Sequence, residues 1–573
     1  MNFIAKITFL RPVLGKLSRL LTRKHKIYIV LLLALTIGFS LVETIGVSVI
    51  MPFISLASDP AILNDGWYKK IFDFLGFSSA NKFIIAMGIG IICFYLFRAI
   101  YSVFLTWFVN KFSTGMFKYF SRKVFKTYLS ISYKVYAQKN SAVLMQSISN
   151  ETNDVGKIIL NLLQLCSEFF TILMVYSVII IINWKMTLIV SGILLIIVTF
   201  LLLIMTKINK AQGEKRLIAG RNMNRTLKET LGNLKYIKLK GNEESVLRSY
   251  DSAIETRTHS EIINNVLGIV PKSILESIGF SFLIAVIVFL IWSYNDASKV
   301  IPIISLYALA LYRILPSVHR MLLNISNIAF AEKTLDGVYD SLQQTVEKEG
   351  SAPVDFISSI RLENITFKYI TSNEIINNIT LEIKKGEKIA ITGESGSGKS
   401  TLVDIITGIH KPYSGKVLID DTAITDENIR SWRKKIGYIP QSIYLFDGSV
   451  AENVSFGSEP DEAKIITALQ KANIWDFLAS KEGLNTLVGD GGIQLSGGQQ
   501  QRIGIARALY DDPEILVLDE ATSALDTETE QKIMDEIYTV SANKTLIIIA
   551  HRLSTVERCD RKICMEDGKI DRK

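Results

Sequence analysis

A glycine-rich segment in the C-terminal half of the chain carries residues that can bind nucleotide phosphates. Residues 393–400 read Gly-Glu-Ser-Gly-Ser-Gly-Lys-Ser, between an apolar run at 389–392 and a helical pattern from Thr401. In such a strand–loop–helix unit, glycines let backbone N–H groups turn toward the phosphates, and the helix N-terminus adds positive potential. Lys399 then contacts the outer phosphates, and the Ser400 hydroxyl ligates Mg²⁺. The segment predicts a site for ATP and Mg²⁺.

A second segment predicts the groups that hydrolyse the nucleotide. Residues 515–518 read Ile-Leu-Val-Leu, the pattern of a buried strand, and Asp519 and Glu520 follow it. Asp519 is expected to hold Mg²⁺ through water, and Glu520 to polarise the attacking water as general base. Adjacent carboxylates at a strand end also occur in plain turns, but the phosphate-binding loop in the same chain favours the catalytic interpretation.

These segments belong to a chain whose N-terminal part is strongly apolar. The chain has 573 residues, of which 49% are hydrophobic, concentrated before about residue 332. A membrane span needs about 20 apolar residues. The sequence predicts six spans, near 28–55, 83–109, 157–183, 187–206, 262–292 and 300–330.

The distribution of Lys and Arg predicts the orientation of these spans. The net charge is +9, and Lys and Arg are frequent in 1–27, 111–156 and 207–261 but rare in 184–186 and 293–299. Basic connections mark the cytoplasmic side, so both termini are expected inside. The basic N-terminus suits anionic membrane lipids. Nucleic-acid binding is the weaker interpretation, because no basic stretch with interspersed aromatic residues follows. The long inner stretches are expected to be helices.

The inner helices are expected to contact the ATPase through two short segments, near 138–150 and 226–240. The alternative is that these segments are solvated amphipathic surface.

The first outer connection, residues 62–77, fits either a short interfacial helix or a packed surface helix. None of the four cysteines has the spacing of a metal ligand, so all four are interpreted as structural thiols.

Several charged residues lie within or near the apolar spans: Glu43, Arg98, Glu168, Lys272, Glu276, Arg313 and Arg320. A central charge costs about 3 kcal/mol, so it faces a partner or a wet cavity. Lys272 and Glu276 are four apart and can pair. The three arginines have no such local partner. Two interpretations stay open for them: ion pairs across helices, or a basic cavity for an anionic headgroup, because the arginine fork suits phosphate.

Together with Leu-Ser-Gly-Gly-Gln at 495–499, these segments resemble the ATP-binding cassette (ABC) family over the whole chain. The resemblance implies a membrane α-helical six-span exporter domain at 1–331, a linker at 332–356 and an α/β P-loop nucleotide-binding domain at 357–573. In that family the Ser-Gly-Gly segment faces nucleotide bound to the other subunit. The resemblance therefore implies a homodimer with two equivalent ATP sites.

The resemblance also implies roles for individual residues. Glu520 and His551 are the catalytic pair, with His551 on the γ-phosphate, and Tyr369 stacks on adenine. The remaining ATP contacts within the chain are Gly393, Glu394, Ser395, Gly396, Ser397, Gly398, Lys399, Ser400, Thr401, Gln441 and Asp519. Mg²⁺ is held by Ser400, Gln441 and Asp519. The contacts made in trans are Ser496, Gly497, Gly498, Gln499 and Asp526.

Four segments of the N-terminal part carry a narrower resemblance, to bacterial lipid-linked oligosaccharide flippases of the PglK group: 40–58, 93–98, 236–240 and 306–317. This implies movement of an undecaprenyl-pyrophosphate-linked glycan from the inner to the outer leaflet of the bacterial cytoplasmic (inner) membrane, for protein glycosylation or surface glycan assembly. Arg98, Arg313 and Arg320 would hold the pyrophosphate, and alanine in their place is expected to abolish flipping but not ATPase activity.

Other cargoes and one other class of protein remain open. A lipid A or phospholipid flippase would have the same architecture of membrane helices and ATPase domain. A hydrophobic-drug exporter would have less need of unpaired arginines. The other class is an ATP-gated channel or regulator, which would not transport a substrate against its gradient. The intact Glu520 and signature segment argue against this last alternative.

Overall fold

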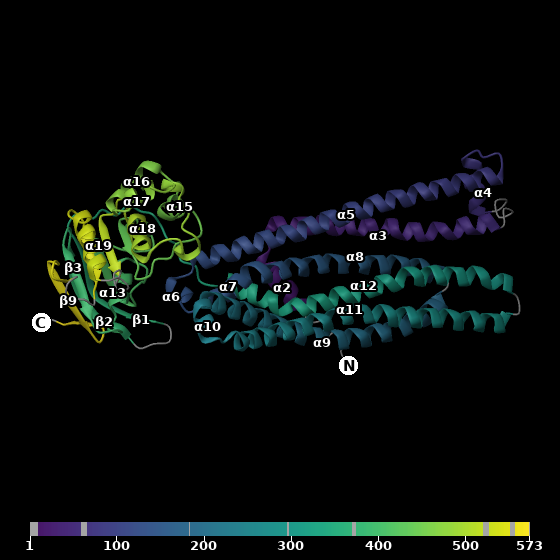
Figure 1. Ribbon diagram of the computed structural model, residues 1–573. Coiled ribbons are helices and arrows are strands. Elements are labelled where there is room, and N and C mark those ends of the chain that lie inside the picture. The colour runs from purple at the N-terminus through teal and green to yellow at the C-terminus, as the bar shows by residue number, and fades with distance from the viewer. Residues whose placement is uncertain are drawn as a thin grey trace. The chain divides into compact units, whose positions relative to one another are not determined.

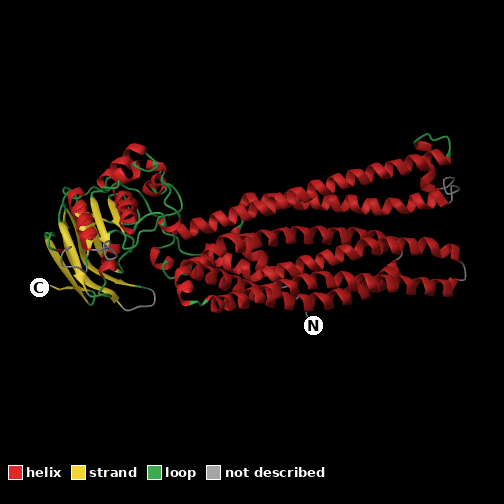
Figure 2. Cartoon of the chain, in the orientation of Figure 1, coloured by secondary structure: helices red, strands yellow, loops and turns green. Residues whose placement is uncertain are grey.

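The computed structural model describes residues 10–58, 66–182, 184–294, 297–369, 374–519, 527–550 and 556–571. The chain divides into two compact units. The helical unit comprises residues 1–129 and 139–344, and the α/β unit comprises residues 130–138 and 345–573. The first consists of long helices, and the second combines strands with short helices (Figures 1 and 2).

The helical unit holds one long helix for each expected span. Its elements are α2 (Leu10–Leu20), α3 (Arg23–Ser58), α4 (Gly66–Phe74), α5 (Ala80–Ser130), α7 (Ser141–Gln146), the π-helix η2 (Ser147–Glu151), α8 (Thr152–Ile182), α9 (Trp184–Gly232), α10 (Leu234–Lys240), α11 (Glu243–Tyr294) and α12 (Ala297–Leu342). The expected spans fall in α3, α5, α8, α9, α11 and α12. Within the described part, four stretches are long and apolar enough to cross a membrane: 23–54, 80–130, 141–181 and 194–232.

Two expected boundaries differ from the structure. Helix α12 continues to Leu342, so the first half of the expected linker is helical. Leu335 and Val338 are fully buried in the core of the helical unit, which explains why the helix extends this far. The segment that belongs to the α/β unit is 130–138, with α6 (Tyr133–Tyr136), so this contact begins eight residues before the expected segment 138–150.

Hydroxyl groups inside α3 are satisfied by its own backbone. Thr36, Ser40, Thr44 and Ser48 each donate to the carbonyl oxygen four residues earlier, at 2.7, 3.1, 2.8 and 2.8 Å. Such bonds let polar residues lie in an apolar environment at little cost. The Thr171 hydroxyl of α8 donates to Ser40 Oγ at 3.0 Å. The ladder therefore also links α3 to α8.

The long helices pack in a defined order. Helix α8 packs against α3 and α12, and α9 packs against α11 and α12. Helices α3 and α5 run side by side, with α4 at their far end (Figure 1). One apolar cluster, which includes Phe120, Ile158 and Leu335, joins α5, α8 and α12. A second cluster, with Leu202 and Leu275, joins α9 and α11.

The crossing of α9 and α12 depends on a glycine. A Cβ on Gly213 would lie 1.9 Å from the Phe330 carbonyl oxygen. We therefore expect Gly213→Ala to force the helices apart and to lower the free energy of unfolding by about 1–3 kcal/mol or more. Gly192→Ala, in the same helix with nothing within 4 Å, is the matched control and should stabilise slightly, because alanine is the better helix former. Thermal unfolding of both variants in detergent checks this, and equal melting temperatures would contradict it.

The α/β unit contains two sheets. Its elements are α6, β1 (Ser359–Lys368), β2 (Glu374–Lys384), β3 (Lys388–Gly393), α13 (Lys399–Ile406), β4 (Ser414–Ile419), β5 (Thr422–Ala423), α14 (Ile429–Arg433), β6 (Ile436–Ile439), α15 (Val450–Ser455), α16 (Glu462–Lys471), α17 (Trp475–Ala479), η3 (Gly483–Asn485), η4 (Asp490–Gly492), α18 (Gly497–Leu509), β7 (Ile515–Asp519), α19 (Thr527–Val540), β8 (Thr545–Ile549), β9 (Arg561–Glu566) and β10 (Lys569–Asp571). The smaller sheet has the order β2-β1-β4-β5, and its strands are antiparallel.

The larger sheet positions the predicted ATP residues. Its order is β10-β9-β3-β8-β7-β6, with parallel pairing from β9 through β6. Parallel strands end at one edge of a sheet, which is where α/β proteins bind ligands. Strands β3 and β7 flank β8, so the loop after Gly393 and the carboxylate of Asp519 lie at the same edge. The predicted α/β P-loop fold is confirmed.

Candidate functional site

The glycine-rich loop joins β3 to α13, as predicted. Gly393, Gly396 and Gly398 have φ values of 143°, 89° and 100°, which L side chains rarely adopt. A Cβ on Gly393 would lie 2.2 Å from the Met565 carbonyl oxygen. Only glycine therefore fits at the end of β3, where the chain turns into the loop.

Two buried side chains of the loop, Lys399 and Ser397, have polar groups that can bind a phosphate. Lys399 is 5% exposed, and its Nζ lies 3.0 Å from the Gly393 carbonyl oxygen and 2.8 Å from that of Glu394. An ammonium has three donors, so one is left for a phosphate oxygen. The buried Ser397 Oγ has no hydrogen-bond partner within the described residues. Ser400 is exposed at the start of α13. This arrangement fits the phosphates of a nucleotide.

The end of β7 provides a concentration of negative charge. The Tyr438 hydroxyl of β6 donates to Asp519 Oδ2 at 2.8 Å. Burial, and then the nearby Asp519 carboxylate, raise the pKa of Asp404 in α13 to about 6. Gln441 follows β6, the strand paired with β7, at the same edge. Carboxylate, amide and hydroxyl oxygens are the ligands that Mg²⁺ prefers, so Asp519, Gln441 and Ser400 fit this ion. Tyr438 was not predicted from the sequence.

Tyr369 follows β1 and lies against α13. Its hydroxyl is 3.4 Å from Thr401 Oγ1 and 3.3 Å from His410 Nε2. The ring is half-buried. The structure thus brings Tyr369 to the helix that begins at the phosphate loop, and its stacking on adenine stays a prediction.

The Ser-Gly-Gly segment begins α18. Ser496 is the N-cap residue, and it forms a reciprocal capping box with Gln499: Ser496 N donates to Gln499 Oε1 at 2.9 Å, and Gln499 N donates to Ser496 Oγ at 3.4 Å. Ser496 and Gly497 are exposed, and Gly498 is half-buried. The N-terminus of a 13-residue helix, which attracts anions, therefore lies at the surface of the chain.

Four of the predicted site residues cannot be placed by their side chains. Glu520, Asp526 and His551 lie outside the described residues. Arg313 lies in α12, but its side chain is also outside the described part. The roles of these four residues therefore stay predictions.

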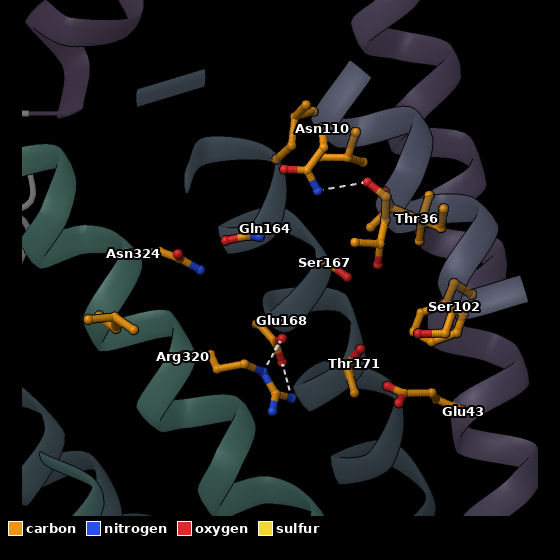
Figure 3. Close-up of a pocket in the computed structure, with 16 residues that line it drawn as sticks. Thr36, Glu43, Ser102, Asn110, Gln164, Ser167, Glu168, Thr171, Arg320 and Asn324 are labelled. Atoms are coloured by element: carbon orange, nitrogen blue, oxygen red, sulfur yellow. Dashed lines mark hydrogen bonds and ion pairs between the residues drawn. The ribbon is translucent and has the colours of Figure 1, made fainter. Parts of the chain in front are cut away.

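A second candidate site is a cavity of about 450 Å³ inside the helical unit (Figure 3). Helices α3, α5, α8 and α12 line it with Thr36, Phe39, Glu43, Ser102, Leu105, Thr106, Val109, Asn110, Leu163, Gln164, Ser167, Glu168, Thr171, Arg320, Leu323 and Asn324. Amide, hydroxyl and charged groups thus meet within helices that the sequence assigns to the membrane. Asn110, Gln164 and Asn324 were not predicted from the sequence, although amides in apolar helices are a detectable signal.

The arginines expected at a pyrophosphate are paired with acids. Arg98 Nη2 lies 2.8 Å from Glu43 Oε1. Arg320 makes two bonds to Glu168, from Nε at 2.5 Å and from Nη2 at 3.0 Å (Figure 3). Of the two interpretations that the sequence left open, ion pairs across helices describe both arginines. Neither is a free cation in this structure.

An apolar cavity of about 350 Å³ lies on the opposite face of α8 and α12. Helices α8, α9 and α12 line it, mostly with aliphatic and aromatic side chains such as Phe169, Leu194 and Leu322. Along α8, Glu168 and Thr171 face the polar cavity, whereas Phe169 and Ile172 face the apolar one. The α8–α12 pair therefore separates a polar compartment from an apolar one.

Apolar helices joined in one chain to an α/β unit with a phosphate loop define an ATP-driven membrane transporter. Comparison with known proteins agrees. The chain belongs to the ABC transporter family: the model for the ABC transporter matches residues 376–523, and that for the ABC transporter transmembrane region matches residues 45–313. It is an ATP-hydrolysing, multi-pass membrane transporter with its ATPase domain in the cytoplasm.

Relatives of this chain include ATP-dependent lipid A-core flippases. That of Paraburkholderia xenovorans is 30% identical over 78% of this chain and 76% of its own length. That of Pseudomonas aeruginosa is 30% identical over 81% and 77%. The heterocyst differentiation ATP-binding protein HepA of Nostoc is 30% identical over 78% and 74%. A solved bacterial Atm1-family ABC exporter with ATP bound shares the fold, with a TM-score of 0.76, 22% identity, and coverage of 96% of this chain and 94% of that one.

Proposed function

We propose that this transporter is a flippase for a glycolipid. The cargo that we favour is an undecaprenyl-pyrophosphate-linked oligosaccharide, moved from the inner to the outer leaflet of the bacterial inner membrane for protein glycosylation or surface glycan assembly. The observation that carries the proposal is the polar cavity between α3, α5, α8 and α12. Its amides and hydroxyls can form hydrogen bonds with sugar hydroxyls. Polar side chains within membrane helices cost free energy, so a cavity lined by them indicates a binding site for a polar group.

The paired arginines change the expected mode of binding. With Arg98 and Arg320 held by Glu43 and Glu168, the cavity carries little net charge from these groups. Neutral hydrogen bonding to the glycan then contributes more than attraction of the pyrophosphate. This is consistent with a carrier that accepts several glycans.

The second candidate cargo is a lipid A-core glycolipid or a phospholipid. The named activity of the relatives favours it, and the same cavity suits a sugar-bearing headgroup of either kind. A hydrophobic drug would instead occupy the apolar cavity, without use of the polar one.

The working unit that we propose is a homodimer with six spans in each copy. Helix α10 exposes Leu234, Tyr236 and Leu239, which are apolar side chains that the ATPase domain of a second copy would cover. The exposed start of α18 would then contact nucleotide on that copy through Ser496, Gly497 and Gly498. Gln499 serves this contact by holding the cap of the helix. Asp526, which directly precedes α19 in the sequence, would add a contact of its own.

Each proposed ATP site combines groups from both copies. Mg²⁺, held by Ser400, Gln441 and Asp519, would supply charge neutralisation at the phosphates. Lys399 binds the outer phosphates, Glu520 polarises water, and His551 contacts the γ-phosphate. Binding of ATP closes the two ATPase domains, and hydrolysis with loss of phosphate reopens them.

Reconstitution into proteoliposomes tests the cargo. Vesicles would contain a labelled lipid-linked oligosaccharide, a lipid A-core glycolipid or a labelled phospholipid, with ATP and with wild type or Glu520→Gln. We expect ATP-dependent flipping of the lipid-linked oligosaccharide that the variant loses. Flipping of the lipid A-core glycolipid or the phospholipid, but not of the lipid-linked oligosaccharide, would establish the second candidate. Flipping of none of the three lipids by an active ATPase would reject both candidates.

A further inference from the structure

A buried histidine connects the predicted adenine side of the ATP site with α6. His410 is 3% exposed. Its ring stacks on Phe367, with the centroids 4.9 Å apart and the planes at 24°. Its Nε2 lies 3.3 Å from the Tyr369 hydroxyl and 3.8 Å from Asp404 Oδ2. The Tyr133 ring of α6 is 5.8 Å away, centroid to centroid. One imidazole thus touches groups from β1, α13 and α6.

The segment 130–138 is fixed to the α/β unit beside this histidine. Ile131 pairs with Val346 in an isolated β-bridge, and Glu347 N donates to the Ser130 carbonyl oxygen at 2.7 Å. Lys134 Nζ donates to the Lys368 carbonyl oxygen at 2.6 Å and lies 5.3 Å from the centre of the Phe367 ring. Helix α6 is therefore held against the end of β1, directly before Tyr369.

The chain on either side of α6 continues into the membrane helices. Residue 130 is the last residue of α5, and α7 begins at residue 141, followed by η2 and α8. The backbone therefore joins α6 to α5 on one side and, through α7 and η2, to α8 on the other, and both α5 and α8 line the polar cavity.

We propose that His410 is a positioning residue that fixes the orientation of Tyr369 and links it to α6. The proposal rests on the proposed role of Tyr369 as the residue that stacks on adenine. The Tyr369 ring can turn about its side-chain bonds, and the contacts of its hydroxyl with Thr401 and His410 limit that rotation. His410 then contacts both Tyr369, which adenine would meet, and Tyr133 of α6.

The charges around His410 suit a neutral ring. The groups that face it are Asp404 of α13, Lys134 and Tyr133 of α6, and Tyr369 after β1. Burial, and then the Lys134 ammonium, lower the pKa of His410, so the imidazole is uncharged at neutral pH. A neutral imidazole offers one donor and one acceptor, which is enough to serve the Tyr369 hydroxyl.

Paired substitutions test the link between His410 and Tyr369. His410→Phe keeps a ring on Phe367 but loses Nε2, and Tyr369→Phe keeps a ring for adenine but loses the hydroxyl. We expect each to raise the KM for ATP about 2- to 10-fold, the loss of one neutral hydrogen bond, with kcat nearly unchanged. Because Tyr369→Phe already removes the contact with His410, the double variant should be no worse than Tyr369→Phe alone. Unchanged KM values, or effects that multiply, would overturn the proposal.

A further variant separates this proposal from the role of Tyr369 itself. Tyr369→Leu removes the ring and should raise the KM for ATP more than Tyr369→Phe does. An unchanged KM in Tyr369→Leu would reject the adenine role, and the proposal with it. A raised KM in Tyr369→Leu with no effect of His410→Phe would reject the positioning role of His410 alone.

Hydrogen exchange of the backbone amides at 131–137 tests the link to α6. In the wild-type protein, saturating ATP should change the exchange rate of this segment, and in His410→Ala that change should be lost. Tyr413→Ala, which removes a ring that is 67% exposed near His410, is the matched control and should respond as wild type does. A full ATP-dependent change in His410→Ala would show that α6 does not respond through His410.

Discussion

Glu520→Gln is expected to lower ATP turnover by about 10²–10⁴-fold while leaving ATP affinity intact. Glutamine keeps the size and polarity of the side chain but cannot accept a proton, and a general base contributes a factor of this order. The expected position of Glu520, directly after Asp519 at the carboxyl edge of the sheet, supports this role. Phosphate release measures turnover, and binding of labelled ATP measures affinity.

Two neighbouring variants make this result specific. Lys399→Met should lose ATP binding as well as turnover, because Lys399 is the buried cation of the phosphate loop. Tyr438→Phe removes the hydroxyl that donates to Asp519 and should change turnover by much less than Glu520→Gln does. Turnover in Glu520→Gln within a factor of ten of wild type would assign the base to another residue.

Arg320→Ala is expected to destabilise the helical unit by about 1–3 kcal/mol. Removal of Arg320 leaves the Glu168 carboxylate, which is 14% exposed, without its partner, and the cost stays below that of a fully buried pair because the Arg320 side chain is 41% exposed. Glu168→Gln should have a smaller effect, because the unpaired Arg320 guanidinium is the more exposed of the two groups. The double variant Glu168→Gln/Arg320→Gln should recover most of the loss, since it leaves no unpaired charge. Unfolding in detergent, followed by tryptophan fluorescence, measures the three variants.

This expectation differs from the sequence-based one, in which alanine in place of Arg98, Arg313 and Arg320 abolishes flipping and leaves ATPase activity largely intact. If Arg320→Ala is as stable as wild type and loses only flipping, Arg320 serves the cargo rather than the fold. The control is Arg257→Ala, which breaks an i,i+4 pair with Glu261 whose side chains are 34% and 44% exposed. Surface pairs of this kind contribute about 0.3–0.5 kcal/mol.

The sequence predicted the parts of the molecule whose pattern is local. The phosphate loop is one example, because a buried strand, glycines at positions of positive φ and a helix start follow each other in fewer than 20 residues. Long apolar runs likewise predicted the membrane helices. In both cases the residues that determine the structure are neighbours in the chain.

The parts that were missed depend on contacts between distant residues. Arg320 and Glu168 are 152 positions apart, and helical spacing cannot reveal such a pair. Helix α6 is four residues long, and its N-cap Ser132 makes no side-chain cap bond. Its position depends instead on the pairing of Ile131 with Val346, which local pattern does not show. Tyr438 and His410 are common residue types whose roles appear only when β1, β6 and α13 are assembled.

The placement of residues 130–138 has a consequence for how such transporters evolve. The chain passes between the two units three times, after residues 129, 138 and 344. A genetic crossover after residue 344 would exchange the C-terminal half but leave behind the segment that carries Tyr133 and Lys134. The incoming half would meet a foreign segment at Phe367 and His410. A chimaera that carries residues 130–138 together with 345–573 is therefore expected to keep these contacts, and one joined at residue 344 is expected to lose them.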